Sequence, residues 1–150
     1  MSKDWVKDIA DMHLKFGVDR WTASKSIDRD FDSLKKFLQF RIGFLKEELA
    51  ETEKALAEED PEEIVDGLID LCVVAIGTLD AFDVRAYEAW DKVHKANMSK
   101  EPGVKPERPN PLGLPDLIKP EGWQGPEHKD NHGSLPFIFQ KHMGKKSEES

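Results

Sequence analysis

The sequence predicts an all-α protein, an antiparallel bundle of about four main helices followed by an irregular, proline-rich C-terminal extension. Three observations predict this class. Apolar residues recur at helical spacing through the first hundred residues, no segment alternates as a strand should, and eight of the nine prolines lie between Pro102 and Pro136. We therefore expect a helical core over residues 1–100. Residues 101–150 are expected to form an irregular extension with a flexible tail in the same domain.

Four helices account for the apolar spacing. The first is expected from about residue 4 to residue 16, where Gly17 ends it, and the second from about residue 32 to residue 58, begun by Asp30 or Asp32. The third begins near Pro61 with Asp60 as its cap and runs to about residue 81. The fourth runs from about residue 83 to residue 98. Short connections between them favour antiparallel neighbours.

Composition and charge exclude several classes of protein. The chain carries 22 basic and 30 acidic residues, a net charge of −8, which argues against a general nucleic-acid binder. The single cysteine, Cys72, allows no intrachain disulfide and fits a reducing, cytoplasmic compartment. The chain starts without an apolar signal region, and its longest apolar run, residues 71–76, is too short to span a bilayer. We therefore expect no membrane association.

The negative charge is concentrated in one segment. Residues 47–70 hold eleven acids and a single base, Lys54. The expected second and third helices each carry three acids spaced three or four residues apart, so that each set shares one helix face. These acids are Glu47, Glu48 and Glu51 on one helix and Glu63, Asp66 and Asp70 on the next.

The surroundings of Asp66 and Asp70 are more informative than their spacing. Residues 64–76 are otherwise almost entirely apolar, so this helix is expected at the centre of the bundle. Buried carboxylates are costly and two on one face repel each other, so protonation, basic partners or bound cations must compensate. Arg41 and Lys46 are too few for six acids, and oxygen-only ligands suit a hard cation, Mg²⁺ first and Mn²⁺ second.

The acids allow other interpretations. A solvated helix surface explains the glutamates alone, and paired core acids explain the two aspartates alone, but two acidic faces flanking one short turn favour a metal site. A di-iron site is disfavoured, because neither acidic helix has a histidine three residues after a glutamate.

These motifs resemble the all-α nucleoside triphosphate pyrophosphohydrolases, a superfamily that includes MazG, dimeric dUTPases and phosphoribosyl-ATP pyrophosphohydrolase. Its signature, Glu-Glu-x-x-Glu on one helix and Glu-x-x-Asp on the next, is similar to residues 47–51 and 63–66, with Asp70 one turn later. Val-His-Lys-Ala-Asn-Met-Ser-Lys at residues 93–100 and Lys-Pro-Glu-Gly-Trp at residues 119–123 resemble short single-domain MazG-like proteins. The resemblance covers about residues 5–125. It departs at Gly67, where the common pattern has a glutamate, so Asp66 or Glu63 is expected to supply that ligand.

The resemblance implies an enzyme, a Mg²⁺-dependent hydrolase that converts a nucleoside triphosphate to the monophosphate and pyrophosphate. Glu47 or Glu48 is expected to take a proton from the attacking water. The other implied roles are metal binding by Glu48, Glu51, Glu63, Asp66 and Asp70, and substrate binding by Asn97, Lys100 and Arg41. Lys100 also fits as a complement to a helix dipole, and Arg41 as the partner of a carboxylate.

The resemblance also implies a homodimer or homotetramer. Two alternatives for the function remain open at this point. One is phosphoribosyl-ATP as the substrate. The other is a non-catalytic module that binds a metal or a partner, an interpretation that the departure at Gly67 supports.

Overall fold

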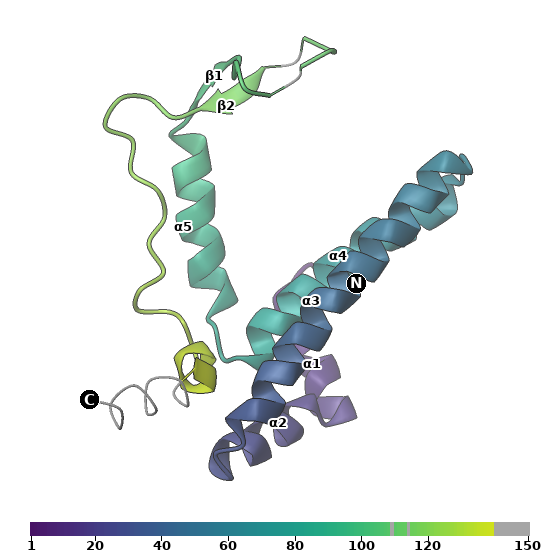
Figure 1. The fold of residues 1–150 in the computed structure, drawn as a ribbon, viewed down its shortest axis with the longest axis vertical. Coiled ribbons are helices and arrows are strands. Elements are labelled where there is room, and N and C mark those ends of the chain that lie inside the picture. Colours follow the sequence, from purple (N-terminus) through teal and green to yellow (C-terminus); the bar gives the residue numbers. More distant parts are fainter. Residues whose placement is uncertain (109, 114, 140–150) are drawn as a thin grey trace, which may run out of the picture. The chain divides into compact units, whose positions relative to one another are not determined.

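The computed structural model describes residues 1–139 except 109 and 114, and the flexible tail predicted beyond residue 139 lies outside this part. Five helices come first: α1 (Trp5–Phe16), α2 (Val18–Ile27), α3 (Phe31–Ala57), α4 (Pro61–Ala81) and α5 (Ala86–Met98) (Figure 1). Two strands, β1 (Glu101–Gly103) and β2 (Asp116–Ile118), and a 3₁₀ helix, η1 (Leu135–Phe139), follow. The chain divides into two compact units, which we describe separately: residues 1–86 with 132–139, and residues 87–131.

The predicted all-α class is confirmed, and most predicted helix ends are close to those observed. Asp30 begins α3 by accepting a hydrogen bond from the Ser33 N–H at 3.2 Å, and Asp60 caps α4 in the same way through the Glu63 N–H. Gly17 ends α1 with a left-handed backbone, φ 80°, which glycine adopts without strain.

Helix α2 was not predicted. Its apolar residues do not gather on one face, so the sequence carries almost no helical periodicity there. The fourth predicted helix starts three residues later than expected, at Ala86, because α4 ends at Ala81 and Asp83 takes a left-handed backbone with φ 58°. The two short antiparallel strands were also not predicted, since three residues are too few to show an alternating pattern.

Helices α3 and α4 form a long antiparallel hairpin that dominates the first unit (Figure 1). A tight connection over residues 58–60 joins them, with Glu59 in the left-handed region at φ 55°. The buried residues of α4 are spaced seven, three and four positions apart and therefore share one face, which packs on α3; they are Gly67, Val74, Gly77 and Ala81. On α3, the buried positions Leu34, Glu48 and Ala55 are separated by multiples of seven and form the matching seam.

The apolar core lies at the end of the hairpin that contacts α2. Leu34, Ala81, Phe82 and Ile138 are buried together there, and the backbone N–H of Ser134 donates to the Phe82 carbonyl at 2.7 Å. Residues 132–139 therefore pack against the core at this end of the hairpin, although they are distant in sequence from α3 and α4.

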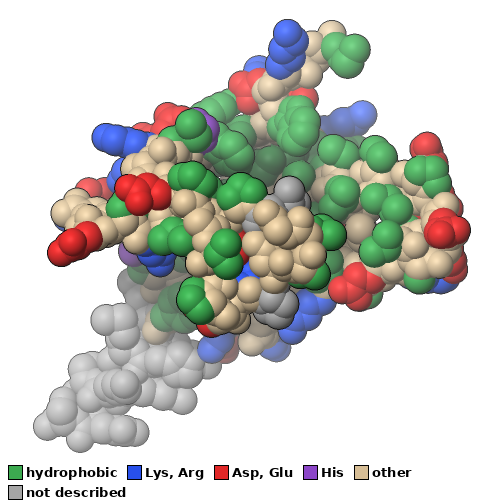
Figure 2. All heavy atoms as spheres, turned by 90° about the horizontal axis from the view of Figure 1, so that it is seen from above, with side chains coloured by type: hydrophobic (Ala, Val, Ile, Leu, Met, Phe, Trp, Pro, Cys, Tyr) green, Lys and Arg blue, Asp and Glu red, His purple; other side chains and the backbone are tan. Residues whose placement is uncertain are grey.

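The other end of the hairpin is less well covered. Leu56, Val65 and Leu68, towards the connection between α3 and α4, are more than half exposed. Other large apolar side chains of the first unit are exposed to a similar degree, among them Trp5, Leu14, Phe16, Ile27 and Phe40. Figure 2 shows apolar side chains at the surface among acidic ones. Within the described residues, no helix is both long and apolar enough to cross a membrane.

In the second unit, the chain leaves α5, forms β1, and returns through β2 in register, with Glu101 opposite Ile118. The segment after β2 then passes back along α5. The Lys92 ammonium donates to the Glu127 carbonyl at 2.8 Å, and the Trp123 indole contacts the end of the helix. These contacts hold an otherwise irregular segment against α5.

Candidate active site

Glu48 and Asp70 occupy the seam between α3 and α4, at positions where a helix hairpin usually places apolar side chains. Glu48 is only 8% exposed. Asp70 is half-buried and lies between the buried Gly67 and Val74 on the inward face of α4. Two more acids, Glu51 on α3 and Asp66 on α4, lie close enough to influence them electrostatically. We call Glu48, Glu51, Asp66 and Asp70 the acidic cluster.

The carboxyl groups of the acidic cluster disfavour one another's ionisation. Burial raises the pKa of Glu48, and the negative charges of Asp70, Glu51 and Asp66 raise it further, with a smaller effect from Glu47. The pKa of Asp70 is raised by burial, by the charge of Asp66 and a side-chain hydrogen bond with it, and by Glu51. The carboxylates of the acidic cluster therefore repel one another at neutral pH.

No base relieves this repulsion within the described part of the chain. Lys54 on α3 pairs with Glu58 at 3.8 Å, and no positive group contributes to the raised pKa of Glu48 or of Asp70. A cluster of hard oxygen donors without a basic partner has the chemistry that divalent cations such as Mg²⁺ bind. In residues 1–139 as described, however, no three acidic, histidine or cysteine side chains lie close enough together to hold a metal ion.

At Gly67 the backbone of α4 lies close to Thr52 of α3, beside the acidic cluster. A Cβ at this position would overlap Thr52 Oγ1 and would lie 3.3 Å from Thr52 Cβ. The Thr52 hydroxyl in turn donates to the Glu48 carbonyl at 2.8 Å. At the position where the pyrophosphohydrolase pattern has a glutamate, this chain has a glycine that packs against Thr52. There is no room for a side chain there unless Thr52 moves.

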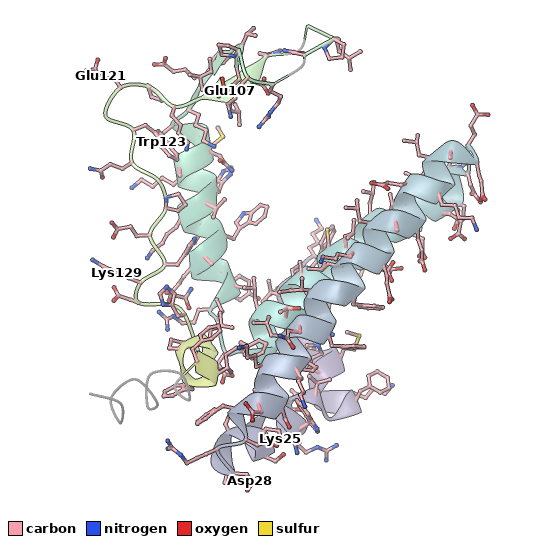
Figure 3. The ribbon with its side chains drawn as sticks, viewed as in Figure 1. Lys25, Asp28, Glu107, Glu121, Trp123 and Lys129 are labelled. Carbon is pink, nitrogen blue, oxygen red and sulfur yellow. The ribbon has the colours of Figure 1, made fainter. Side chains whose placement is uncertain are left out.

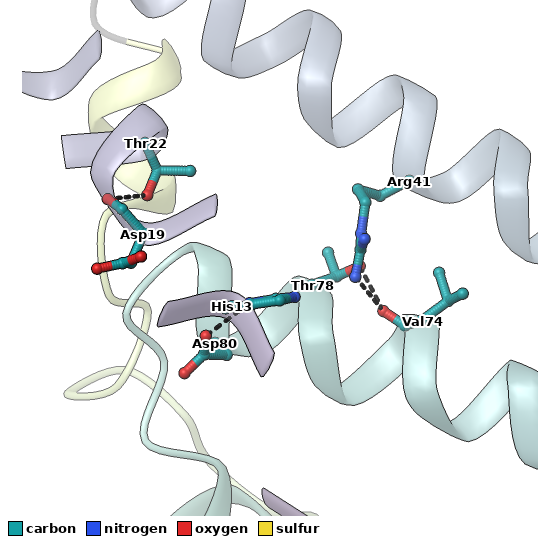
Figure 4. A network of polar contacts seen from close by, with 7 residues as sticks. All are labelled: His13, Asp19, Thr22, Arg41, Val74, Thr78 and Asp80. Carbon is teal, nitrogen blue, oxygen red and sulfur yellow. Dashed lines mark hydrogen bonds and ion pairs between the residues drawn. The ribbon is translucent and has the colours of Figure 1, made fainter. Parts of the chain in front are cut away.

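Arg41 and Gly77 form a second polar region, two turns along the same seam from Glu48 and Asp70, which corresponds to about 10 Å along the helix axis. The Arg41 guanidinium donates to Thr78 Oγ1 at 3.1 Å and to the Val74 carbonyl at 3.2 Å (Figure 4). Burial lowers the pKa of this guanidinium, and no carboxylate in the described residues pairs with it. Its charge is therefore uncompensated within the described part of the chain.

His13 enters this region from α1. Its ring is 3% exposed and its Nδ1 lies 2.7 Å from Asp80 Oδ2, as Figure 4 shows. Gly77 makes room for both groups, because a Cβ there would overlap Arg41 Nη2 and would lie 3.2 Å from His13 Nε2. The His13–Asp80 pair thus helps to anchor α1 to α4 beside the arginine.

Asn97 and Lys100 belong to the second unit. Asn97 lies in the last turn of α5, and its carbonyl accepts a hydrogen bond from the Lys100 N–H at 3.1 Å. The Lys100 ammonium lies 5.3 Å from the centre of the Trp123 ring. No carboxylate pairs with Lys100 within the described residues, so its ammonium remains available to an anion.

The structure brings together some of the predicted site residues and not others. The acidic cluster joins two helices, as the spacing suggested, whereas Glu63 is exposed in the first turn of α4 and has no part in the shifts of Glu48 or Asp70. The sequence pattern did not indicate a role for Thr52, Thr78 or Asp80. Asp80 lies ten residues after Asp70 in the same largely apolar helix. An acid in such surroundings needs a polar partner, and this was the available signal for its contact with another side chain.

A comparison with protein families identifies the region that contains these features. Residues 24–97 match the family model of phosphoribosyl-ATP pyrophosphohydrolase, a member of the all-α nucleoside triphosphate pyrophosphohydrolase superfamily. The chain carries the domain of this superfamily over residues 24–97. It is therefore a pyrophosphohydrolase, an enzyme acting on phosphoric anhydride bonds. The match includes the whole acidic cluster, Arg41 and Asn97, and ends before Lys100 and Trp123. No curated protein and no solved structure matches the chain.

Proposed function

We propose that this pyrophosphohydrolase uses Mg²⁺ to cleave a nucleoside triphosphate into the monophosphate and pyrophosphate, with water attacking the α-phosphorus. The acidic cluster supports the proposal most directly. Glu48 and Asp70 lie in the seam with the exposed Glu51 and Asp66 beside them, and both have raised pKa values and no basic partner within the described residues. Such a group of carboxylates is costly for the fold unless it serves a cation. Enzymes of the matched family typically depend on a divalent metal.

In this proposal, Glu48, Glu51, Asp66 and Asp70 hold the metal, and Glu63 joins them from the first turn of α4. The carboxylates must converge when the ion binds. Bound Mg²⁺ would neutralise the phosphates and lower the pKa of a water molecule. Glu47 is exposed beside Glu48 and is the better candidate to accept the proton from the attacking water, because Glu48 is buried and engaged with the ion.

Positive and neutral donors would bind the substrate itself. Arg41 supplies a guanidinium that no carboxylate compensates in the described residues, and its remaining N–H groups suit a phosphate or a carbonyl oxygen. Asn97 and Lys100 are proposed to bind phosphate oxygens. None of these groups identifies the nucleobase.

Phosphoribosyl-ATP is a second candidate substrate, because the matched family model carries that name. Both candidates release pyrophosphate, so the reaction type alone does not separate them. One panel of substrates does separate them: ribo- and deoxynucleoside triphosphates beside phosphoribosyl-ATP, each assayed with Mg²⁺, Mn²⁺ or EDTA. We expect metal-dependent release of pyrophosphate together with the monophosphate.

Variants of the acidic cluster test the assignment of the metal ligands. Glu48→Gln and Asp70→Asn should reduce turnover by at least about 100-fold, since each removes a charged ligand from the metal. Glu53→Gln is the matched control, because Glu53 is an exposed acid on the same helix. The assignment is wrong if all three variants hydrolyse the substrate at the rate of the wild-type enzyme.

We also propose that the enzyme is a homodimer or homotetramer. The exposed apolar side chains of α1, α3 and α4 support this, because a monomer rarely leaves so many large apolar groups in water. Sedimentation velocity at micromolar concentration should show a species larger than one chain. A purely monomeric profile would contradict the proposal.

A further inference from the structure

Trp123 lies outside the family match, in the segment that follows β2, and it reaches the end of α5. A tight turn directs it there. The Trp123 N–H donates to the Pro120 carbonyl at 3.0 Å, and Gly122 takes a left-handed backbone, φ 74°, which suits glycine at this point of a turn. Figure 3 shows the indole beside the last turn of α5.

The indole N–H of Trp123 completes the cap of this helix. It donates to the Ala96 carbonyl at 3.0 Å and lies 2.8 Å from Ser99 Oγ, which itself donates to the same carbonyl at 2.7 Å. Carbonyl groups in the last turn of a helix have no partner within the helix. Trp123 and Ser99 satisfy one of them jointly, and this fixes the path of the chain just before Lys100.

The face of the same ring attracts two ammonium groups. Lys100 Nζ lies 5.3 Å from the ring centre and Lys119 Nζ lies 5.2 Å from it, both within the range of a cation–π interaction. Lys100 directly follows the capped turn, whereas Lys119 precedes the turn that carries Trp123. The ring therefore restrains Lys100 at two points, through its backbone and through its charged end.

We propose that Trp123 is a positioning residue for Lys100, which it holds in place to bind the phosphate of the nucleotide. This inference rests on the proposed function. A free lysine side chain loses several rotatable degrees of freedom when it binds an anion, and a side chain that is already ordered loses fewer. Loss of the ring should therefore weaken substrate binding while leaving the chemical step largely unchanged.

The first part of the test measures the restraint itself. In the wild-type enzyme, the ε-methylene protons of Lys100 should show an upfield ring-current shift in the NMR spectrum. Trp123→Leu should remove that shift, and Trp123→Phe, which keeps a ring without the N–H, should retain most of it. Circular dichroism checks that both variants keep their helices. An unshifted Lys100 in the wild-type enzyme would overturn the proposal.

The second part measures the consequence for catalysis. Trp123→Leu should raise KM about tenfold with little change in kcat. In a Lys100→Met background the same change should have almost no further effect, because residues that act through one another are not additive. Lys119→Met is the matched control, since Lys119 lies equally close to the ring, and it should leave KM near the wild-type value.

Three results would overturn the positioning role. These are an unchanged KM in Trp123→Leu, an effect of equal size with and without Lys100, and an equal loss in Lys119→Met. A wild-type enzyme that hydrolyses no nucleotide in the panel would instead refute the proposed function, and the substrate role of Lys100 with it. The NMR shift would still show whether Trp123 holds the ammonium, so the two failures are distinguishable.

Discussion

Replacement of Gly67 by alanine tests how tightly α3 and α4 pack beside the acidic cluster. In an exposed helix interior, glycine to alanine stabilises a protein by about 1 kcal/mol. At Gly67 the added Cβ would overlap Thr52 Oγ1, and overpacking of this kind typically costs about 1–3 kcal/mol. If the Thr52 hydroxyl turns away, its hydrogen bond to the Glu48 carbonyl is lost, at a cost of about 1 kcal/mol. We therefore expect Gly67→Ala to be destabilised by about 1–3 kcal/mol.

Gly43→Ala is the matched control, because Gly43 lies within α3 and a Cβ there would have no neighbour within 4 Å. This variant should be stabilised by up to about 1 kcal/mol. Urea unfolding followed by far-UV circular dichroism measures both changes. Thr52→Ala, combined with Gly67→Ala, should recover at least about 1 kcal/mol relative to the sum of the single changes. The close contact is refuted if Gly67→Ala becomes as stable as Gly43→Ala.

Three further predictions concern the polar groups of the seam. The raised pKa values of Glu48 and Asp70 mean that the folded protein binds these protons more tightly than the unfolded chain does. The free energy of unfolding should therefore rise as the pH falls from neutral through the raised pKa values towards the ordinary carboxyl range. In thermal melts, the double variant Glu48→Gln with Asp70→Asn should flatten that rise. Asp80→Asn weakens the partner of the buried His13 and should cost about 1–3 kcal/mol in urea unfolding, a change that an unaltered midpoint would contradict. Arg41→Lys should raise KM about tenfold, because an ammonium cannot reproduce the guanidinium fork; unchanged kinetics would exclude Arg41 from the substrate site.

The acidic cluster explains why stability and activity are expected to conflict in this enzyme. Apolar residues at positions 48 and 70 would complete the seam between α3 and α4 and remove the repulsion among the carboxylates. The proposed chemistry requires those charges. Substitutions that neutralise them should therefore stabilise the fold and abolish turnover together, which is the usual relation at a functional site.

Much of the helical architecture could be predicted because it depends on local signals. Asp30, Asp60, Gly17 and Pro61 mark helix ends through interactions within a few residues, and they occupy those positions in the structure. Helix α2 could not be predicted, because it lacks an apolar face and is held by its contacts with α3. The two short strands depend on pairing between residues that are thirteen or more positions apart, which no local pattern encodes.

Part of the candidate site could likewise be predicted from the sequence, and part could not. The spacing of Glu48, Glu51, Asp66 and Asp70 is a property of the sequence, since three or four residues along a helix always bring side chains to one face. The sequence by itself thus determined helices α1, α3, α4 and α5, the acidic faces and the resemblance to pyrophosphohydrolases. Only the tertiary structure decided that Glu48 faces Asp70, that Gly67 meets Thr52, and that the Trp123 ring lies against Lys100. These contacts join residues far apart in the chain, and their existence depends on how whole elements pack.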